Sequence, residues 1–248
     1  VPPLRIRTVN GAPVREPARW VLYWMTAARR ASANFALERA ADWARRLGLP
    51  LVVLEALRCD YPWASDRLHR FIIDGMVDNR RALAARAVCY HPYVEPTRGA
   101  GRGLLAALAE QAAVVVTDDF PTFFLPRMVA AAGQRLGVRL EAVDTNGLLP
   151  MAAGEREHPT AYAFRRLLQR ELLGHLDPFP LEDPCHDLPP AADLPAEISE
   201  RWPAADLASL TGGPQALAAL PIDHSVTVVE QRGGSAAAED RLRAFLDA

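Results

Sequence analysis

Lysine is absent from this sequence, and all 28 positions counted as Lys or Arg are arginine. A P-loop requires a lysine beside its phosphates, and Schiff-base enzymes require an amine that condenses with a carbonyl. The composition therefore excludes P-loop ATPases and pyridoxal-dependent enzymes. A lysine-free chain rich in alanine, arginine and proline is typical of a GC-rich genome, so the arginines alone do not indicate selection for arginine chemistry.

Long apolar runs are also lacking. No stretch approaches the roughly 20 apolar residues of a membrane-spanning helix, and the chain does not open with a signal peptide. With 50% of its 248 residues hydrophobic and 23% charged, it has the composition of a soluble globular protein. Cys59, Cys89 and Cys185 are odd in number and form no CxxC pair, which indicates neither a zinc site nor a disulfide framework. We expect a protein of the reducing cytoplasm without membrane contact.

The formal net charge of -2 averages two unlike parts. Residues 1–176 contain 24 arginines and 17 acidic residues, whereas residues 177–248 contain 4 arginines and 13 acidic residues. The arginines of the basic part are scattered along expected helices, and solvated helix faces explain them as well as a phosphate-binding surface does. Charge is therefore weak support for nucleic-acid binding.

Short apolar runs alternate with amphipathic segments through the first two thirds of the chain. Continuous runs such as residues 20–25 are typical of buried parallel strands, and apolar residues at helical spacing follow each run. This alternation predicts a Rossmann-like α/β fold, with a five-stranded parallel sheet and helices on both faces. The expected strands are residues 20–25, 49–57, 87–90, 113–117 and 138–143. The expected helices are residues 37–47, 68–83 (after Ser65 and Asp66), 104–108 and 125–136.

The organisation changes near residue 176. Residues 1–19 are expected to form an N-terminal arm and residues 20–176 the α/β domain, whose last helix lies near residues 160–176. Residues 177–223 hold nine of the 21 prolines and many acidic side chains, which predicts a linker. Residues 224–248 contain a GG turn and a final amphipathic stretch, and they predict the beginning of a further helical unit.

Polar residues follow several of the expected strands. In an open parallel sheet, ligands bind outside the carboxyl ends of the strands, so these residues are candidates for a ligand site, although each could instead be a cap or turn residue. The candidates at strand ends are Thr26, Arg30, Glu55, Arg58, Thr117, Asp118, Asp119, Asp144, Thr145 and Asn146.

Several motifs of known chemistry are missing. The turn after the first strand has no glycine, which disfavours a nicotinamide-dependent enzyme, and no GxSxG motif marks a hydrolase. The glycines at 99, 101 and 103 could approach a phosphate or form a flexible connection. Asp118 and Asp119 supply few ligands for a metal ion, and the six histidines form no ligand-spaced cluster. The residues themselves predict a small-ligand-binding α/β domain.

Five segments together resemble class II deoxyribodipyrimidine photolyases. They are WVLYWMTAARRASANFALERA (residues 20–40), LHRFIIDGM (residues 68–76), VVVTDDFP (residues 114–121), VDTNGLLP (residues 143–150) and TAYAFRR (residues 160–166). In the first, Tyr23, Trp24 and Met25 form the YWM strand, Arg30 lies in the loop, and Asn34 begins the helix. The chain departs from the pattern at Phe35, where the family usually has tryptophan, and at Ala31, where an acidic residue is common.

This resemblance implies a function that composition and spacing do not. Photolyases repair cyclobutane pyrimidine dimers in DNA with light: an N-terminal α/β domain holds an antenna pigment, a deazaflavin or a folate, and a helical domain holds FAD and the flipped dimer. Residues 233–246 resemble the first helix of that helical domain, which the resemblance extends beyond Ala248. By position, it implies pigment contacts from Trp24, Met25, Arg30, Glu55, Asp118, Asp119, Phe120, Asp144 and Asn146, with no catalytic residue and no metal ligand in this chain.

The resemblance implies that this chain is the antenna half of a photolyase, with damaged DNA bound through the other half and FAD expected only there. Two alternatives stay open. One is a stand-alone nucleotide-binding or regulatory module, since such sheets serve many functions. The other is a cryptochrome-like photosensor that shares this domain.

Overall fold

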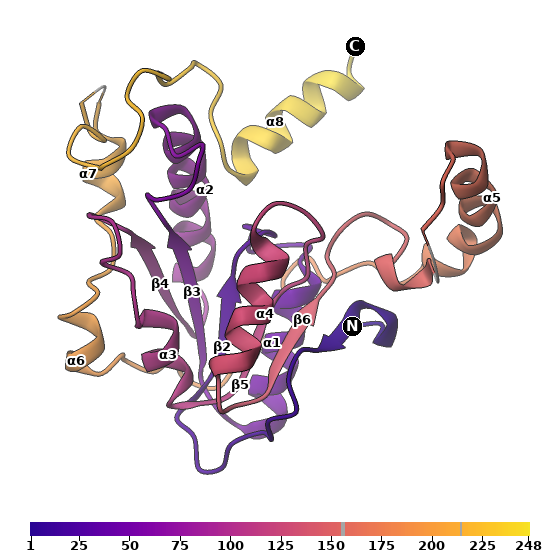
Figure 1. Ribbon diagram of the computed structural model, residues 1–248, viewed down its shortest axis with the longest axis horizontal. Coiled ribbons are helices and arrows are strands. Elements are labelled where there is room, and N and C mark those ends of the chain that lie inside the picture. Colours follow the sequence, from indigo (N-terminus) through magenta and orange to yellow (C-terminus); the bar gives the residue numbers. More distant parts are fainter. Residues whose placement is uncertain (155–156, 214) are drawn as a thin grey trace.

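The computed structural model describes residues 1–154, 157–213 and 215–248, and it places a six-stranded sheet at the centre of the molecule (Figure 1). The strand order is β1-β6-β5-β2-β3-β4. The strands are β1 (Ile6–Thr8), β2 (Trp20–Met25), β3 (Leu51–Leu57), β4 (Val88–Val94), β5 (Ala112–Asp118) and β6 (Leu140–Val143).

The five strands β2 to β6 are parallel, as the alternating pattern predicted. The prediction of a sheet with only five strands was wrong, because β1 adds an antiparallel edge in which Ile6 lies opposite Val143 and Thr8 opposite Glu141. This strand has three residues, too few to show an alternating pattern in the sequence. Its pairing with β6 is one of several contacts that hold the expected arm against the sheet, together with hydrogen bonds of Asn10 and Arg15.

Helices cover both faces of the sheet. Alternate residues of β2 enter two different cores: Tyr23 packs against α1 (Phe35–Leu47), whereas Leu22 packs against the opposite side. The second core contains residues of α3 (Leu104–Ala109) and α4 (Leu125–Arg135). The strand residues are buried because parallel strands covered on both faces expose neither set of side chains.

Two helix boundaries follow directly from capping residues. The side chain of Asn34 accepts hydrogen bonds from the backbone amides of Ala36 and Leu37 and begins α1. Gly48 ends it in the left-handed region, with φ of 65°. The longest helix, α2 (Asp66–Ala84), starts after Ser65 and lies along β3 and β4.

The proline-rich segment is ordered against this body. It contains the short helices α6 (Ala196–Ser199) and α7 (Leu207–Thr211), and Trp202 is only 4% exposed. The Trp202 indole donates to the carbonyl of Ala100 at 2.9 Å, and its ring lies against Gly103. The segment therefore forms a strap over α3 and the edge strand β4.

The remaining elements project from the body. Helix α5 (Ala161–Glu171), continued by the 3-10 turn Leu172–His175, stands apart from the sheet in Figure 1, and α8 (Ser235–Leu246) extends from α2 with only its first turn in contact.

Two further 3-10 turns are Pro3–Arg5 and Met151–Ala153. Among the described residues, none of the helices has the length and hydropathy needed to cross a membrane.

Candidate functional site

The order of the strands reverses at β2, which lies between β5 and β3. In open α/β sheets, the crevice for ligands lies at such a switch point, outside the carboxyl ends of the strands. Here the loops that leave β2, β3, β5 and β6 meet at that end. These loops contain most of the candidates at strand ends.

Asp118 lies at the centre of this region, and its carboxylate holds the loop that follows β2. Its Oδ2 atom accepts hydrogen bonds from the backbone amides of Thr26 and Ala27, each at 2.7 Å, and of Ala28 at 3.2 Å. Its Oδ1 atom accepts from the hydroxyl of Tyr23 at 2.7 Å. Asp118 is only 2% exposed, so its oxygens serve the fold rather than an open surface.

Asn34 extends the same network. Its side-chain amide donates to the Tyr23 hydroxyl at 3.0 Å and to the carbonyl of Ala28 at 2.9 Å. Burial and the neighbouring Asp118 charge raise the pKa of Tyr23 well above its ordinary value, so the phenol stays protonated and donates. Thr145 joins the network at the start of α1, where its hydroxyl accepts from the amide of Ala36.

Glu55, at the end of β3, forms a second buried centre. Its carboxylate accepts hydrogen bonds from the hydroxyl of Tyr90 at 2.6 Å, from the amide of Asn79 at 2.9 Å and from the guanidinium of Arg29 at 3.2 Å. Burial, followed by the adjacent Glu55 charge, raises the pKa of the Tyr90 hydroxyl. Arg29 also donates to the carbonyl of Ala56, which ties the loop after β2 to the end of β3.

Asp144 holds the loop after β6 through hydrogen bonds to its carboxylate. It accepts from the backbone amides of Asn146 and Met151 at 2.8 and 2.7 Å, and its carboxylate lies 3.7 Å from the buried guanidinium of Arg5. The side chain of Asn146 donates to the carbonyl of Asp119 at 2.7 Å and so joins two of the loops.

The other sequence candidates have structural partners too. Trp24 and Met25 are buried on opposite faces of the sheet, and the Thr117 hydroxyl donates to the carbonyl of Trp24. Arg30 bonds the carbonyl of Ala33 within its own loop. Two exposed pairs complete the set: Arg7 with Asp119 at 2.8 Å, and Arg58 with Asp60 at 2.6 Å.

The amides of the glycine loop are already occupied by a side chain of the protein. One oxygen of Glu95 accepts from the amides of Gly99 and Gly101 at 3.0 and 3.1 Å, and the other accepts from the amide of Cys59. The carboxylate thus occupies the cradle of N–H groups that an anion would need. Burial and Glu95 together raise the pKa of the Cys59 thiol to about 11.

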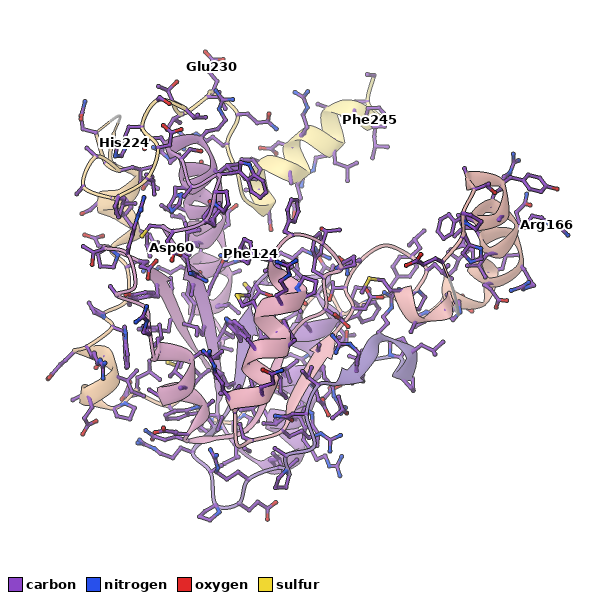
Figure 2. The ribbon with its side chains drawn as sticks, in the orientation of Figure 1. Asp60, Phe124, Arg166, His224, Glu230 and Phe245 are labelled. Carbon is purple, nitrogen blue, oxygen red and sulfur yellow. The ribbon has the colours of Figure 1, made fainter. Side chains whose placement is uncertain are left out.

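A group of aromatic side chains, here called the aromatic bridge, crosses the switch point. Of its members, only Phe120 was among the candidates from the sequence. The loop after β3 and the loop after β5 each contribute rings. The ring centroids of Trp63 and Phe123 lie 6.0 Å apart in an edge-to-face arrangement. Figure 2 shows Asp60 and Phe124, one from each loop, near the upper ends of the strands. The aromatic bridge consists of Tyr61, Trp63, Phe120, Phe123 and Phe124.

Three of these rings, Trp63, Phe123 and Phe124, are exposed, and Tyr61 and Phe120 are partly buried. Trp63 is 58% exposed and Phe123 is 69% exposed, whereas the tryptophans of the core are nearly inaccessible. Phe123 also has a positive φ of 59°, a conformation that costs a bulky residue about 1–3 kcal/mol. The signal in the sequence was the placement of aromatic residues in expected loops, in YPW (residues 61–63) and FPTFF (residues 120–124).

Unpartnered polar atoms lie directly beneath the bridge. His69 stacks on Tyr61 with ring centroids 5.8 Å apart. Within the described part of the chain, neither ring nitrogen of His69 nor the hydroxyl of Tyr61 has a hydrogen-bond partner. Burial lowers the pKa of His69, which keeps its imidazole neutral at physiological pH. This end of the sheet therefore exposes apolar ring faces, while the polar atoms of His69 and Tyr61 are buried below them.

The described residues were compared with the ligand sets that hold metal ions. No group of three or more His, Cys, Asp or Glu side chains suited to a metal ion occurs in residues 1–154, 157–213 and 215–248. All three cysteines are free thiols. Asp118 and Asp119, adjacent in the sequence, are separated in function, since one is buried in the loop network and the other pairs with Arg7.

Comparison with known proteins points to one family by sequence. No family model matches the chain. A deoxyribodipyrimidine photo-lyase of Methanothermobacter thermautotrophicus is 32% identical over 169 residues, which cover 68% of this chain and 37% of that enzyme.

Two solved structures share the fold. A bacterial class III photolyase from Agrobacterium tumefaciens matches with a TM-score of 0.60 at 17% identity, covering 94% of this chain and 46% of its own. An archaeal photolyase from Sulfolobus tokodaii is described with two FAD molecules and an implied novel light-harvesting cofactor. It matches with a TM-score of 0.54 at 13% identity, and the match covers 91% of this chain and 45% of the archaeal chain. The chain spans less than half the length of each of these three proteins.

Proposed function

Because photolyases are the homologues of this chain, we propose that it forms the N-terminal, pigment-binding half of a photolyase. The whole enzyme would repair cyclobutane pyrimidine dimers with light, and damaged DNA and FAD would be bound by the part of the relatives that this chain does not span. The family resemblance of residues 20–40 and 143–150 supports class II. The free thiols support a reducing cytoplasmic location.

The observation that carries the pigment-binding proposal is the aromatic bridge at the switch point. Exposed rings attract one another and other planar rings in offset or edge-to-face arrangements, at about 0.5–1.5 kcal/mol beyond the area that is buried. Trp63 and Phe123 come from different loops and are both more than half exposed. A tricyclic deazaflavin or a folate pterin would cover these rings.

The rings of the bridge, rather than the polar atoms beneath it, would contact such a pigment. The His69 nitrogens and the Tyr61 hydroxyl are buried, so a pigment that covers the rings does not reach them. A bound antenna pigment absorbs light and passes the excitation on to FAD. This chain would bind, orient and shield the pigment.

We assign different roles to the residues that the sequence pointed to. Glu55, Asp118 and Asp144 act indirectly, since their carboxylates hold the surrounding loops in shape. Phe120 stacks on Phe123 with ring planes 3° apart, and it contacts the pigment together with Asn146. Trp24 and Met25 support the site from the core, while Arg30 and Asp119 lie at its margin.

Reconstitution of the purified chain with each pigment tests this proposal. A deazaflavin and a reduced folate are titrated separately while their absorption and fluorescence are followed. The double variant Trp63→Ala with Phe123→Ala should bind at least about tenfold more weakly, the loss expected for two stacking contacts. Phe245→Ala removes an equally exposed ring on α8 and serves as the control. Unchanged affinity of the double variant, or no binding by the wild-type chain, would contradict the proposed site.

A repair assay tests whether FAD binding and dimer repair require the part of the enzyme outside this chain. We expect that the 248-residue chain alone retains no FAD and repairs no dimers, because the helical FAD domain of the family lies outside it. Light-dependent repair by the purified chain would refute this expectation. The homology to photolyases does not favour a stand-alone nucleotide-binding module, and no particular contact favours a photosensor.

A further inference from the structure

Helix α8 is attached to α2 through its first turn. Its N-cap residue is Gly234, which has no side chain to satisfy the free amides of the helix. The carboxylate of Asp78, in α2, takes over this task by accepting a 3.0 Å hydrogen bond from the amide of Ala236. Asp74, one turn earlier in α2, accepts from the amide of Gly233 at 3.4 Å.

Two glycines make this close approach possible. A Cβ atom at Gly233 would lie 1.9 Å from the carbonyl oxygen of Phe71, and one at Gly234 would lie 2.4 Å from the Asp78 carboxylate. Gly234 also has a φ of +95°, which L side chains rarely adopt. A Cβ atom at Gly75 of α2 would lie 3.6 Å from the Gly234 Cα, an ordinary van der Waals distance, so the close approach depends on the two glycines before α8.

Past this turn the helix has few neighbours. Phe245 is 76% exposed, and Figure 2 shows it at the far end of α8, away from α2. A cavity of about 210 Å³, lined among others by Asn79, Arg86 and Glu239, separates the middle of α8 from the body. The contact at residues 233–236 thus decides the direction in which α8 projects.

We infer that α2 orients α8: Asp78 caps α8 from another helix, and Gly233 and Gly234 allow the two helices to approach closely, so that α8 has one orientation relative to the sheet. Asp78 is a positioning residue in this arrangement. If α8 begins the flavin domain, which rests on the function proposed above, the same contact sets the geometry between the pigment and FAD.

Amide hydrogen exchange on the purified, isotope-labelled chain tests the cap itself. The first four amides of a helix have no acceptor within the helix, so protection at Ala236 reports on Asp78 directly. We expect exchange at Ala236 to be slowed about five- to tenfold relative to an unstructured amide. Asp78→Ala should abolish this protection, and Asp78→Asn, which keeps an acceptor oxygen, should retain most of it. An unprotected Ala236 amide in the wild-type chain would overturn the inference.

Residual dipolar couplings test the orientation. In the wild-type chain, the couplings of α8 should fit the same alignment tensor as those of the sheet. Gly233→Ala should scale them down by forcing the turn away from Phe71, whereas Gly137→Ala, at a glycine with nothing within 4 Å of its Cβ position, should leave them unchanged. Averaged α8 couplings in the wild-type chain would refute a single orientation. Neither measurement involves a pigment, so failure here is distinct from failure of the pigment site.

Discussion

The hydroxyl of Tyr23 donates a 2.7 Å hydrogen bond to the carboxylate of Asp118, and this bond joins the neighbouring strands β2 and β5 at the switch point of the sheet. The same carboxylate accepts three consecutive backbone amides of the loop after β2. One buried acidic side chain therefore positions the loop that separates the core from the candidate pigment site.

Asp118→Ala should destabilise the fold by roughly 3 kcal/mol, because it leaves a buried hydroxyl and several amides without an acceptor. Asp119→Ala, which removes only a partly exposed pair with Arg7, should cost no more than about 1 kcal/mol. Urea unfolding followed by circular dichroism measures both values. Equal effects at the two positions would contradict the structural role assigned to Asp118.

Phe123→Gly should leave the stability unchanged or raise it by up to about 1 kcal/mol, since glycine tolerates the positive φ at this position. Phe123→Ala removes the same ring and keeps the strain, so it should be the less stable of the two variants. Thermal unfolding compares them. Both should weaken pigment binding alike, because both remove the exposed ring.

Trp202→Ala should cost about 3–5 kcal/mol, as expected for removal of a buried aromatic side chain. The loss should also release the proline-rich strap from Ala100 and Gly103, and limited proteolysis should then cut within residues 196–207. Trp63→Ala removes the same side chain from an exposed position and should change the stability by less than about 1 kcal/mol. Strap cleavage at equal rates in both variants would contradict the buried contact.

Stability should fall in acid partly because of Glu141. Burial alone would raise the pKa of this carboxyl, but hydrogen bonds from Arg39, Trp43 and Arg139 outweigh burial and lower it. A depressed pKa in the folded state stabilises the protein above the unfolded value of about 4.3, and this contribution disappears as the pH falls through the lower folded pKa.

Glu141→Gln should therefore flatten the decline of stability below pH 4.3, and it should lower stability at pH 7. Urea unfolding between pH 3 and pH 7 measures both effects. An identical pH dependence in the variant and the wild-type chain would show that Glu141 makes no such contribution.

The sequence was sufficient to predict the parallel strands of the core and the helices that cover them. Apolar runs such as residues 20–25 and 113–117 can only be buried, and helical spacing between them leaves few topologies other than a doubly covered parallel sheet. Asn34 and Gly48 likewise mark the ends of α1 by local chemistry, which depends on neighbours in the chain. The resemblance to photolyases also rested on local segments and agrees with the homologue found by sequence.

Contacts between distant residues had to come from the tertiary structure. Strand β1 exists because β6 lies beside it, and no pattern within three residues could show this. The acidic candidates Glu55, Asp118 and Asp144 were correctly placed at strand ends, but only the fold showed that their oxygens are occupied by backbone amides and buried side chains.

Composition and periodicity thus decided which segments are buried and in which order the strands and helices follow, because burial of apolar side chains depends on the residue and its spacing. The tertiary structure decided which polar groups are free, because a hydrogen bond depends on where two distant atoms meet. For this reason the candidate site moved from the carboxylates at the strand ends to the exposed rings of Trp63 and Phe123 above them.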